Sequence, residues 1–508
     1  MARPDIVFIK GQGASKRVAP GQDYISGLLL YTGSLPSGFT TTNNTKELYS
    51  IVDAENAGIL PNYADATAAT STYLITTKGN TGDTIAWVYT GAQGAVLNLG
   101  TYTVGSSDTT IALQGAAWAA IINAGTNTHG CTASFTTATL TVTLPKSQGI
   151  FPNSGTPNAI TLTGAFAGTL TQNVVAGVAS KQAVWHYHIS EFFRGNPNSV
   201  LWIGFYSVPS TYTFAEITLL QTASGGTIRQ MGVYKDAAAW ANADLTAINT
   251  QVVTYNDNKH KPLSVLYAAD LSATSDITTV YDLSTLSANK VSSIIGQDGN
   301  ALGNFLYLTY GKSITHLGIA LGLLSLSAVS EDFGEPAKFN ISDGTENAIP
   351  AFANGQLLSS PVLSDSALDA INSKRHIFAQ QYIGYSGTFF VDNHTAISAS
   401  SDYAYINDNR VIDKATRGIY TALIPYLKSR LIKNADGTLT TTTIAFLQNQ
   451  CLAPLYQMNR DGDLSTVSTS DVYIDPTQNV TSTSTLVITV LLNEDAIARN
   501  IQIPISYK

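Results

Sequence analysis

The feature that most constrains the fold is the nine-residue run "VLWIGFYSV" (200–208), in which nearly every side chain is apolar. A strand that is covered on both faces reads in this way, whereas a half-exposed strand alternates apolar and polar residues. Strand-like and helix-like segments then alternate along the chain, which favours a mainly parallel sheet covered by helices. We therefore expect a layered α/β domain. Further strands are predicted at 229–234, 263–271 and 290–299, and helical segments at 214–223, 236–255 and 312–330.

Residues 66–180 differ from the rest of the chain in charge. These 115 positions hold four formally charged residues, although charged residues make up 12% of the whole sequence. Short β-forming runs alternate there with Gly, Asn and Ser turns, and one helix-like stretch, 111–125, interrupts them. We expect a separate, mostly β inserted domain. Its predicted strands are 72–77, 84–90, 137–144 and 159–164.

The C-terminal part has a third pattern. Two helices are predicted at 408–432 and 442–458, and the turn "NADGT" (434–438) joins them. The final stretch, 484–508, has the pattern of two alternating strands on either side of a charged turn at 493–499. A chain of 508 residues is too long for one ordinary core, so two or three domains are expected.

Charge and composition disfavour several classes of partner. A net charge of −8 without a basic stripe argues against nucleic acid as the main partner. The longest apolar stretch, 314–329, is too short to span a bilayer, and the first residues lack the apolar core of a signal peptide. Two cysteines, Cys131 and Cys451, lie far apart and form no disulfide framework. We expect a cytoplasmic product without a membrane segment.

Two glycine-containing loops are compared with nucleotide-binding motifs. Gly11 and Gly13 follow an apolar run, but the third glycine of a dinucleotide fingerprint is missing, and Pro20-Gly21 prevents the helix that should follow. Gly311-Lys312-Ser313 resembles the end of a phosphate-binding loop, yet Leu306 occupies the position of its first glycine. The preceding residues, 306–310, are strand-like and bulky. We expect no nucleotide or other cofactor.

Other candidate chemistry is weak. Asp270 and Asp298 both lie near the carboxyl ends of predicted strands, where α/β enzymes place catalytic groups, but aspartates also end strands and cap helices. His186 and His188 would share a face on a strand and hold a metal ion, whereas a helix would separate them. Structural roles are favoured for all four residues. The chain is therefore expected to be a structural protein, with no catalytic or metal site.

Several stretches, taken in order, resemble the tail sheath proteins of contractile phages and related contractile injection systems, in particular the Mu-like prophage sheath group. Each stretch on its own matches only weakly, and the resemblance depends on their order and on how much of the chain they cover. The insert at 66–180 is not part of the resemblance. The matching stretches are 11–33, 47–59, 185–209, 224–234, 291–304, 311–342, 408–438 and 496–508.

The resemblance implies a multidomain α/β (α+β) architecture with a layered sheath core, a mostly β insert and extended terminal arms. The implied parts are an N-terminal arm and linker (1–25), a discontinuous α/β core (26–65 and 181–400), an outward-facing insert (66–180), a C-terminal helical or α+β domain facing the tube (401–485), and a C-terminal exchanged strand arm (486–508).

The resemblance also implies a function. Such a subunit assembles with copies of itself into hexameric rings that stack helically around a tail tube, and contraction drives the tube through a target envelope. The implied partners are the tube protein and the baseplate and neck or terminator proteins, in a virion tail assembled in the host bacterial cytoplasm. The implied site residues are an N-terminal arm (Ile6, Val7, Phe8, Ile9, Gly11, Gly13), a C-terminal arm (Val487, Thr489, Leu491, Ile501, Ile503, Ile505) and a tube-facing basic set (Lys414, Arg417, Lys428, Arg430, Lys433).

Two alternatives remain open from the sequence. One is another structural component, such as a baseplate, capsid or surface-layer protein, which the low charge and the Thr/Asn/Gly-rich insert would suit equally. The other is an α/β enzyme that uses Asp270 and Asp298 at a sheet edge.

Overall fold

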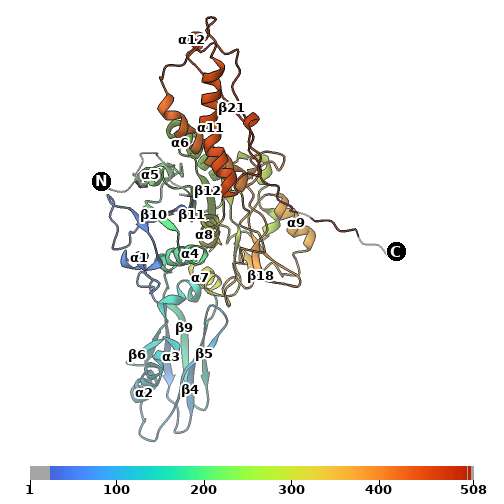
Figure 1. Ribbon diagram of the computed structural model, residues 1–508. Coiled ribbons are helices and arrows are strands. Elements are labelled where there is room, and N and C mark those ends of the chain that lie inside the picture. The colour runs from blue at the N-terminus through green and yellow to red at the C-terminus, as the bar shows by residue number, and fades with distance from the viewer. Residues whose placement is uncertain (1–22, 500, 505–508) are drawn as a thin grey trace, which may run out of the picture. The chain divides into compact units, whose positions relative to one another are not determined.

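The computed structural model describes residues 23–499 and 501–504 (Figure 1). This part of the chain divides into two units. The larger unit holds residues 25–410 and the described residues from 497 onward. The smaller unit holds residues 411–496 and, from the other end of the chain, Asp23 and Tyr24.

A six-stranded sheet organises the larger unit, in the strand order β14-β12-β11-β1-β10-β2. Five of its strands run parallel, and β2 pairs antiparallel with β10 at one edge. This confirms the predicted layered, mainly parallel α/β fold. The strands are β1 (Ile25–Tyr31), β2 (Thr45–Leu48), β10 (Val200–Tyr206), β11 (Gln230–Ala239), β12 (Ser264–Asp270) and β14 (Val291–Ser293).

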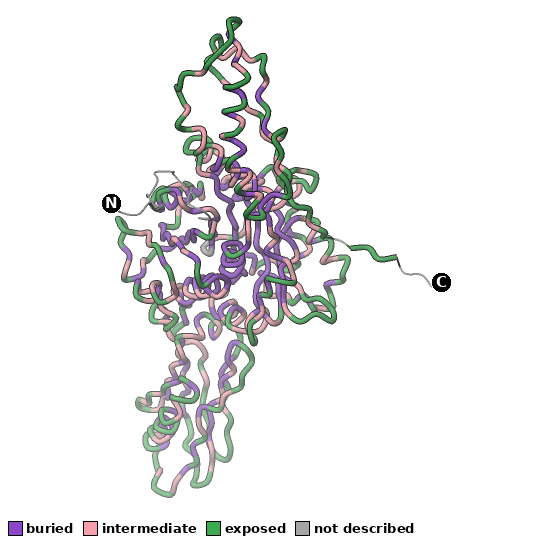
Figure 2. The backbone as a smooth tube through the Cα atoms, in the orientation of Figure 1, coloured by how far each residue is buried: buried purple, intermediate pink, exposed green. Residues whose placement is uncertain are grey.

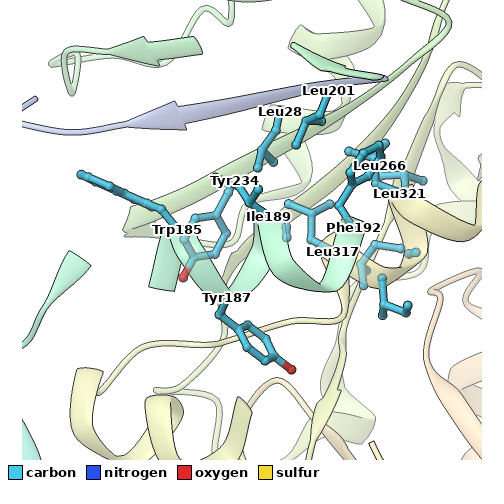
Figure 3. Close-up of a cluster of buried hydrophobic side chains, with 14 of the residues drawn as sticks. Leu28, Trp185, Tyr187, Ile189, Phe192, Leu201, Tyr234, Leu266, Leu317 and Leu321 are labelled. Atoms are coloured by element: carbon cyan, nitrogen blue, oxygen red, sulfur yellow. The ribbon is translucent and has the colours of Figure 1, made fainter. Parts of the chain in front are cut away.

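Helices cover both faces of this sheet. All seven residues of β1 are buried, and its alternate side chains enter two different hydrophobic clusters. Leu28 and Leu30 pack with α4 (Lys181–Gly195) and α8 (Leu317–Leu326). Figure 3 shows Leu28 in this cluster, together with labelled residues of α4 and α8. Leu29 and Tyr31 pack with α5 (Glu216–Ala223) and α6 (Asn242–Lys259) on the opposite face. Burial on both faces explains why these strands read as continuous apolar runs.

Helices α4 and α8 approach each other closely because glycine stands at their contact. A Cβ atom placed on Gly318 would lie 2.3 Å from the carbonyl oxygen of His188, and one on Gly322 would lie 2.4 Å from that of Phe192. Side chains of any size would force the two backbones apart. The contact between α4 and α8 therefore depends on these two glycines.

The charge-poor stretch forms two antiparallel sheets, ordered β6-β7-β3-β9 and β5-β4-β8, around a core of its own that includes Trp87 and Trp118. Helix α2 (Ile111–Ala124) lies within it, as predicted for 111–125. The sequence interpretation found four of the seven strands and missed β5, β6 and β9. The strands are β3 (Thr70–Thr77), β4 (Thr84–Thr90), β5 (Val96–Thr103), β6 (Thr132–Thr136), β7 (Thr139–Thr143), β8 (Asn158–Leu162) and β9 (Ala167–Val175), and a short helix, α3 (Thr126–His129), follows α2.

The rest of the larger unit consists of short elements packed around the sheet. Figure 2 shows the buried residues gathered in this sheet-containing part of the chain. The elements are α1 (Ile51–Asn56), β13 (Ser287–Ala288), β15 (Gly296–Asp298), α7 (Leu302–Tyr310), β16 (Pro350–Phe352), α9 (Asp365–Ser373), β17 (Ala379–Tyr382), β18 (Tyr385–Phe390) and β19 (Ala396–Ile397).

The smaller unit is mainly helical. Its core includes Leu439, Ile444 and Leu447, against which Leu486 and Ile488 pack. Strand β21 pairs antiparallel with β20 of the same chain. The elements in this region are α10 (Ile406–Leu423), α11 (Thr441–Asp461), β20 (Val472–Tyr473), α12 (Val480–Thr483) and β21 (Thr489–Val490).

Three predicted elements are wrong. Residues 306–310, interpreted as strand-like, form the end of α7, and Gly311 closes this helix in the left-handed conformation (φ 71°), so α8 begins only at Leu317. The predicted strand 290–299 is two short strands, β14 and β15, which belong to different sheets. The predicted helix 408–432 ends at Leu423, because Pro425 lies in a single 3₁₀ turn that follows it.

Candidate functional site

Asp270 at the end of β12 is neutralised by its neighbours. Its Oδ2 lies 2.6 Å from Lys312 Nζ, and its Oδ1 accepts hydrogen bonds from the backbone N–H groups of Ser313 (3.2 Å) and Ser272 (3.0 Å). Burial acts to raise the pKa of Asp270, but these donors outweigh it and hold the pKa below its ordinary value. The aspartate and the Lys312-Ser313 pair, two separate candidates in the sequence, are therefore partners in one structural contact.

Asp298 ends a different sheet from Asp270, because it closes β15, which pairs only with β16 among the described strands. Its carboxylate accepts hydrogen bonds from the backbone N–H groups of Ala301 (2.7 Å), Asn304 (3.2 Å) and Asn347 (3.2 Å). Burial raises its pKa. Asp298 thus accepts from the residue before α7 and from the first turn of the helix, where Glu346 accepts from the N–H groups of Leu302 (3.2 Å) and Gly303 (3.4 Å), so the two carboxylates share a capping role.

The two histidines do not form a ligand pair, because both lie on α4 and point in different directions. His186 Nε2 lies 3.0 Å from Glu55 Oε1, whereas His188 is buried and burial lowers its pKa to about 3. Within residues 23–499 and 501–504, no group of three or more His, Cys, Asp and Glu side chains is placed to hold a metal ion. No helix in this same part of the chain has the length and apolar character needed to cross a membrane.

The C-terminal arm residues have different surroundings. Val487 and Leu491 are exposed, while Thr489 lies in β21 opposite Tyr473 of the same chain. Ile501 and Ile503 are 78% and 73% exposed and form no strand, so the predicted second terminal strand is absent from the described residues. The arm residues that lie outside the described part are Ile6, Val7, Phe8, Ile9, Gly11, Gly13 and Ile505.

The predicted tube-facing basic residues divide into two groups. Lys414 pairs with Asp23 (3.3 Å) and Asp463 (2.5 Å), and Arg417 pairs with Asp23 (2.6 Å), so ion pairs within the smaller unit occupy both cations. The other three follow the end of α10 and are exposed in an irregular segment. These are Lys428, Arg430 and Lys433.

A cluster that the sequence interpretation missed surrounds Arg499. The guanidinium Nε donates to Asp392 Oδ1 (3.1 Å), Nη2 donates to Asn393 Oδ1 (3.3 Å), and Nη2 lies 3.6 Å from Asp332 Oδ2. The guanidinium carbon also lies 3.4 Å from the centre of the Tyr405 ring. We call these four partners, Asp332, Asp392, Asn393 and Tyr405, the arginine site. Arg499 lies 107 residues beyond Asp392 and 106 beyond Asn393, and no local motif marks the site.

The arginine site predicts a pH dependence. The pKa of Asp332 is raised from 3.8 to about 7, mainly by burial and secondly by the negative charge of Asp392. The folded chain therefore binds a proton that the unfolded chain releases, so the stability from Asp332 is full below pH 3.8 and is lost as the pH rises through about 7. Arg499 opposes this shift, whereas the neighbouring His394 has its pKa lowered to about 4, mainly by burial.

Asp332→Asn is expected to remove this dependence. Hydrogen exchange at the amides around Asp332 and Asp392, measured from about pH 5 to 8, should show wild-type protection falling relative to the variant as the pH rises. Burial lowers the pKa of His188 and of His316 to about 3, so these histidines destabilise the fold as the pH falls. Both proteins contain them, so their effect cancels when the variant is compared with the wild type. Parallel curves for both proteins would contradict the prediction.

Family models match most of the chain. The N-terminal domain model of DUF2586 matches residues 108–394, and the C-terminal domain model of DUF2586 matches residues 402–508. The chain belongs to the DUF2586 family. In this DUF2586 chain the arginine site joins both matched parts, because Asp332 and Asp392 fall in the first and Tyr405 and Arg499 in the second.

Solved structures similar to this DUF2586 protein include two sheath proteins. One is the helical sheath of the anti-feeding prophage in its contracted state, with 14% identity, a TM-score of 0.44, and coverage of 66% of this chain and 85% of that chain. Another is a sheath tail protein from Listeria innocua, with 9% identity, a TM-score of 0.39, and coverage of 92% and 91%. No curated protein matches the chain.

Proposed function

We propose that this DUF2586 protein is a structural subunit of a contractile tail sheath. It polymerises with copies of itself as stacked hexameric rings around a tail tube and contracts to drive the tube through a target envelope. The ordered resemblance to sheath proteins along most of the sequence supports this proposal. The energy of contraction would reside in a bistable packing of subunits, without nucleotide hydrolysis.

The observation that carries the proposal is the exposed apolar C-terminal segment. Ile501 and Ile503 are separated by one residue, so in an extended strand both side chains point to the same face, and Gln502 points to the other. The two isoleucines are 78% and 73% exposed in the single chain. An extended segment with one apolar face suits strand addition to the sheet of a neighbouring subunit, where main-chain hydrogen bonds provide strength.

The remaining parts receive roles consistent with this proposal. The N-terminal arm (1–25) and the C-terminal arm (486–508) link neighbouring subunits, the insert (66–180) faces outward, and the helical part (401–485) faces the tube. The exposed cations Lys428, Arg430 and Lys433 contribute weak contacts to the tube, which suit a grip that must release. Further partners would be baseplate and neck or terminator proteins, in a virion tail assembled in the host bacterial cytoplasm.

The alternative of an enzyme at Asp270 and Asp298 finds little support in the geometry. Both carboxylates are occupied by hydrogen bonds or an ion pair from the same chain, and they end strands of different sheets. A catalytic pair needs both groups within reach of one substrate.

Assembly tests the proposal directly. We expect the full-length wild-type protein to form hollow ridged cylinders or stacked rings, seen by negative-stain electron microscopy. The variant Ile501→Asp/Ile503→Asp should lower the yield of sedimentable polymer by about tenfold or more, since each buried isoleucine contributes about 1.5–3 kcal/mol. Both substitutions lie at exposed positions, so the fold of the subunit should be unaffected.

The matched control is Gln502→Asp, which adds a charge to the opposite face of the same segment and should leave assembly nearly unchanged. A wild-type protein that stays monomeric at high concentration contradicts the sheath proposal. If the Ile501→Asp/Ile503→Asp variant assembles at the wild-type level, the proposed role of the C-terminal arm is contradicted, but the sheath proposal is not. Particles of a different form, such as closed shells or flat lattices, would favour a capsid or surface-layer protein.

A further inference from the structure

The arginine site has the geometry of a receptor for a guanidinium group. Two carboxylates and an amide oxygen surround the edge of the Arg499 fork, and the Tyr405 ring covers its face at 3.4 Å. Arginine is the residue that satisfies directional acceptors and an aromatic face together. A lysine would supply the charge without the fork or the planar stacking surface.

The receptor side is rigidly held by its own contacts. The amide Nδ2 of Asn393 donates to Asn407 Oδ1 (2.8 Å), which turns its oxygen toward Arg499, and Asp332 Oδ1 accepts from the backbone N–H of Gly334 (2.8 Å). The side chains of Asp332 and Asp392 are 13% and 10% exposed. Two carboxylates this buried are costly without a cation nearby.

Neighbouring basic groups do not pair with the two aspartates. The guanidinium carbon of Arg375 lies 5.1 Å from the centre of the Tyr405 ring, but its Nε donates to the carbonyl oxygen of Thr395 (3.1 Å) and its Nη2 to that of Ala404, so these donors satisfy backbone acceptors. His394 lies 3.7 Å from Asp392, but burial lowers its pKa to about 4, which leaves it neutral near pH 7. Arg499 is therefore the cation that pairs with both aspartates among the described residues.

The chain around Arg499 is much less enclosed than the receptor. Before Arg499, Ile497 is half-buried and Ala498 is exposed. After it, Ile501 and Ile503 are largely exposed. Arg499 thus belongs to a C-terminal segment whose other residues are mostly exposed. A contact made by such a segment with its own chain can be made identically with another copy of the same chain.

We propose that the arginine site is a receptor for the C-terminal segment, which an isolated subunit fills with its own Arg499 and which an assembled subunit fills with Arg499 of a second copy. The proposal rests on the proposed function for the existence of an assembly. Beyond that function, it identifies the arginine site as the receptor and Arg499 as the residue that binds there. It also has a consequence, because Arg499 bound within its own chain cannot link that chain to a second copy. Because the contacts are the same in both states, subunit concentration and the pairing of the following strand decide between them.

Reciprocal charge exchange separates the two states. Variant A carries Arg499→Glu, and variant B carries Asp332→Asn/Asp392→Lys. Alone, each places like charges at the site both within and between chains, and polymer yield should fall about tenfold or more from wild type. In an equimolar mixture the glutamate of A meets the lysine of B, and the arginine of B meets the acids of A, but only between different chains. The mixture should therefore recover most of the wild-type yield.

Variant C carries all three substitutions in one chain and controls for folding, since it restores complementarity both within and between chains. If C assembles and the mixture of A and B does not, the site is filled only within a chain and the inference is overturned. Wild-type yield from A and B alone overturns it as well, although the sheath proposal would stand. Failure of the wild-type protein to assemble refutes the sheath proposal itself.

Should C fail to fold, a milder pair replaces it. Asp392→Asn preserves the shape of the receptor, and Arg499→Gln removes the fork. In their mixture an intact receptor and an intact arm exist only on different copies, so polymer in excess of both single variants arises between chains. Equal yields from the mixture and the two single variants would overturn the inference.

Discussion

Replacing Asp244 with alanine is expected to destabilise the six-stranded sheet by about 3–5 kcal/mol. Asp244 Oδ2 pairs with Lys235 Nζ at 2.6 Å and accepts a hydrogen bond from Tyr267 OH. The side chains of Lys235 and Asp244 are only 6% and 10% exposed, and the ammonium also lies 4.6 Å from the centre of the Tyr212 ring. Removing the carboxylate leaves a buried ammonium without its counter-ion, which is the costly half of a buried ion pair.

Hydrogen exchange at the amides of β11 and β12 provides the measurement, because it reports local opening in a chain of several units. The control Asp257→Ala removes an exposed acid from the same helix, α6, and should change protection by less than about 0.5 kcal/mol. The double variant Lys235→Met/Asp244→Leu should recover most of the loss, since replacing both ions with apolar groups avoids the uncompensated charge. An Asp244→Ala protein with wild-type protection would show that Lys235 finds another partner.

Gly318→Val should separate α4 from α8 and destabilise their contact by about 3 kcal/mol. The new Cβ would lie 2.3 Å from the carbonyl oxygen of His188 and 2.9 Å from its Cα, and both are backbone atoms that no side-chain rotation can move. Valine is a slightly better helix former than glycine, by a few tenths of a kcal/mol, and this gain is too small to offset the clash.

The matched control is Gly33→Ala, because a Cβ on Gly33 meets nothing within 4 Å. The protection of α4 and α8 amides from hydrogen exchange should fall in the Gly318→Val variant and stay unchanged in the control. The insert strands β3–β9 serve as an internal reference in both proteins. Unchanged protection of α8 would mean that the two helices can separate without loss of packing.

The sequence predicted the layered α/β fold because strands buried on both faces leave a plain signal. The runs that became β10, β11 and β12 were assigned within one or two residues at most ends. Strand β1, in the middle of the sheet, received no assignment, although "ISGLLLY" is a continuous apolar run of the same kind. The signal was present there, and a uniform search for such runs would have found it.

Other differences arise from interactions that a local pattern does not contain. Bulky residues at 306–310 suit a strand by propensity, but packing of Leu306 in the main hydrophobic cluster and the cap from Asp298 select a helix. The arginine site is built from side chains that only the fold brings together, so no spacing could reveal it. The exchanged arms and the domain boundaries inferred from the resemblance stay predictions.

The sheet order has a consequence for synthesis on the ribosome. Strand β1 emerges first, yet both of its neighbours, β10 and β11, lie beyond the inserted sheets and begin only at Val200 and Gln230. At roughly 5–20 residues per second, the wait between Tyr31 and Val200 lasts about 10–30 s. During that interval the insert can complete its own core, whereas the nascent strand "ISGLLLY" stays unpaired and open to chaperones or to aggregation.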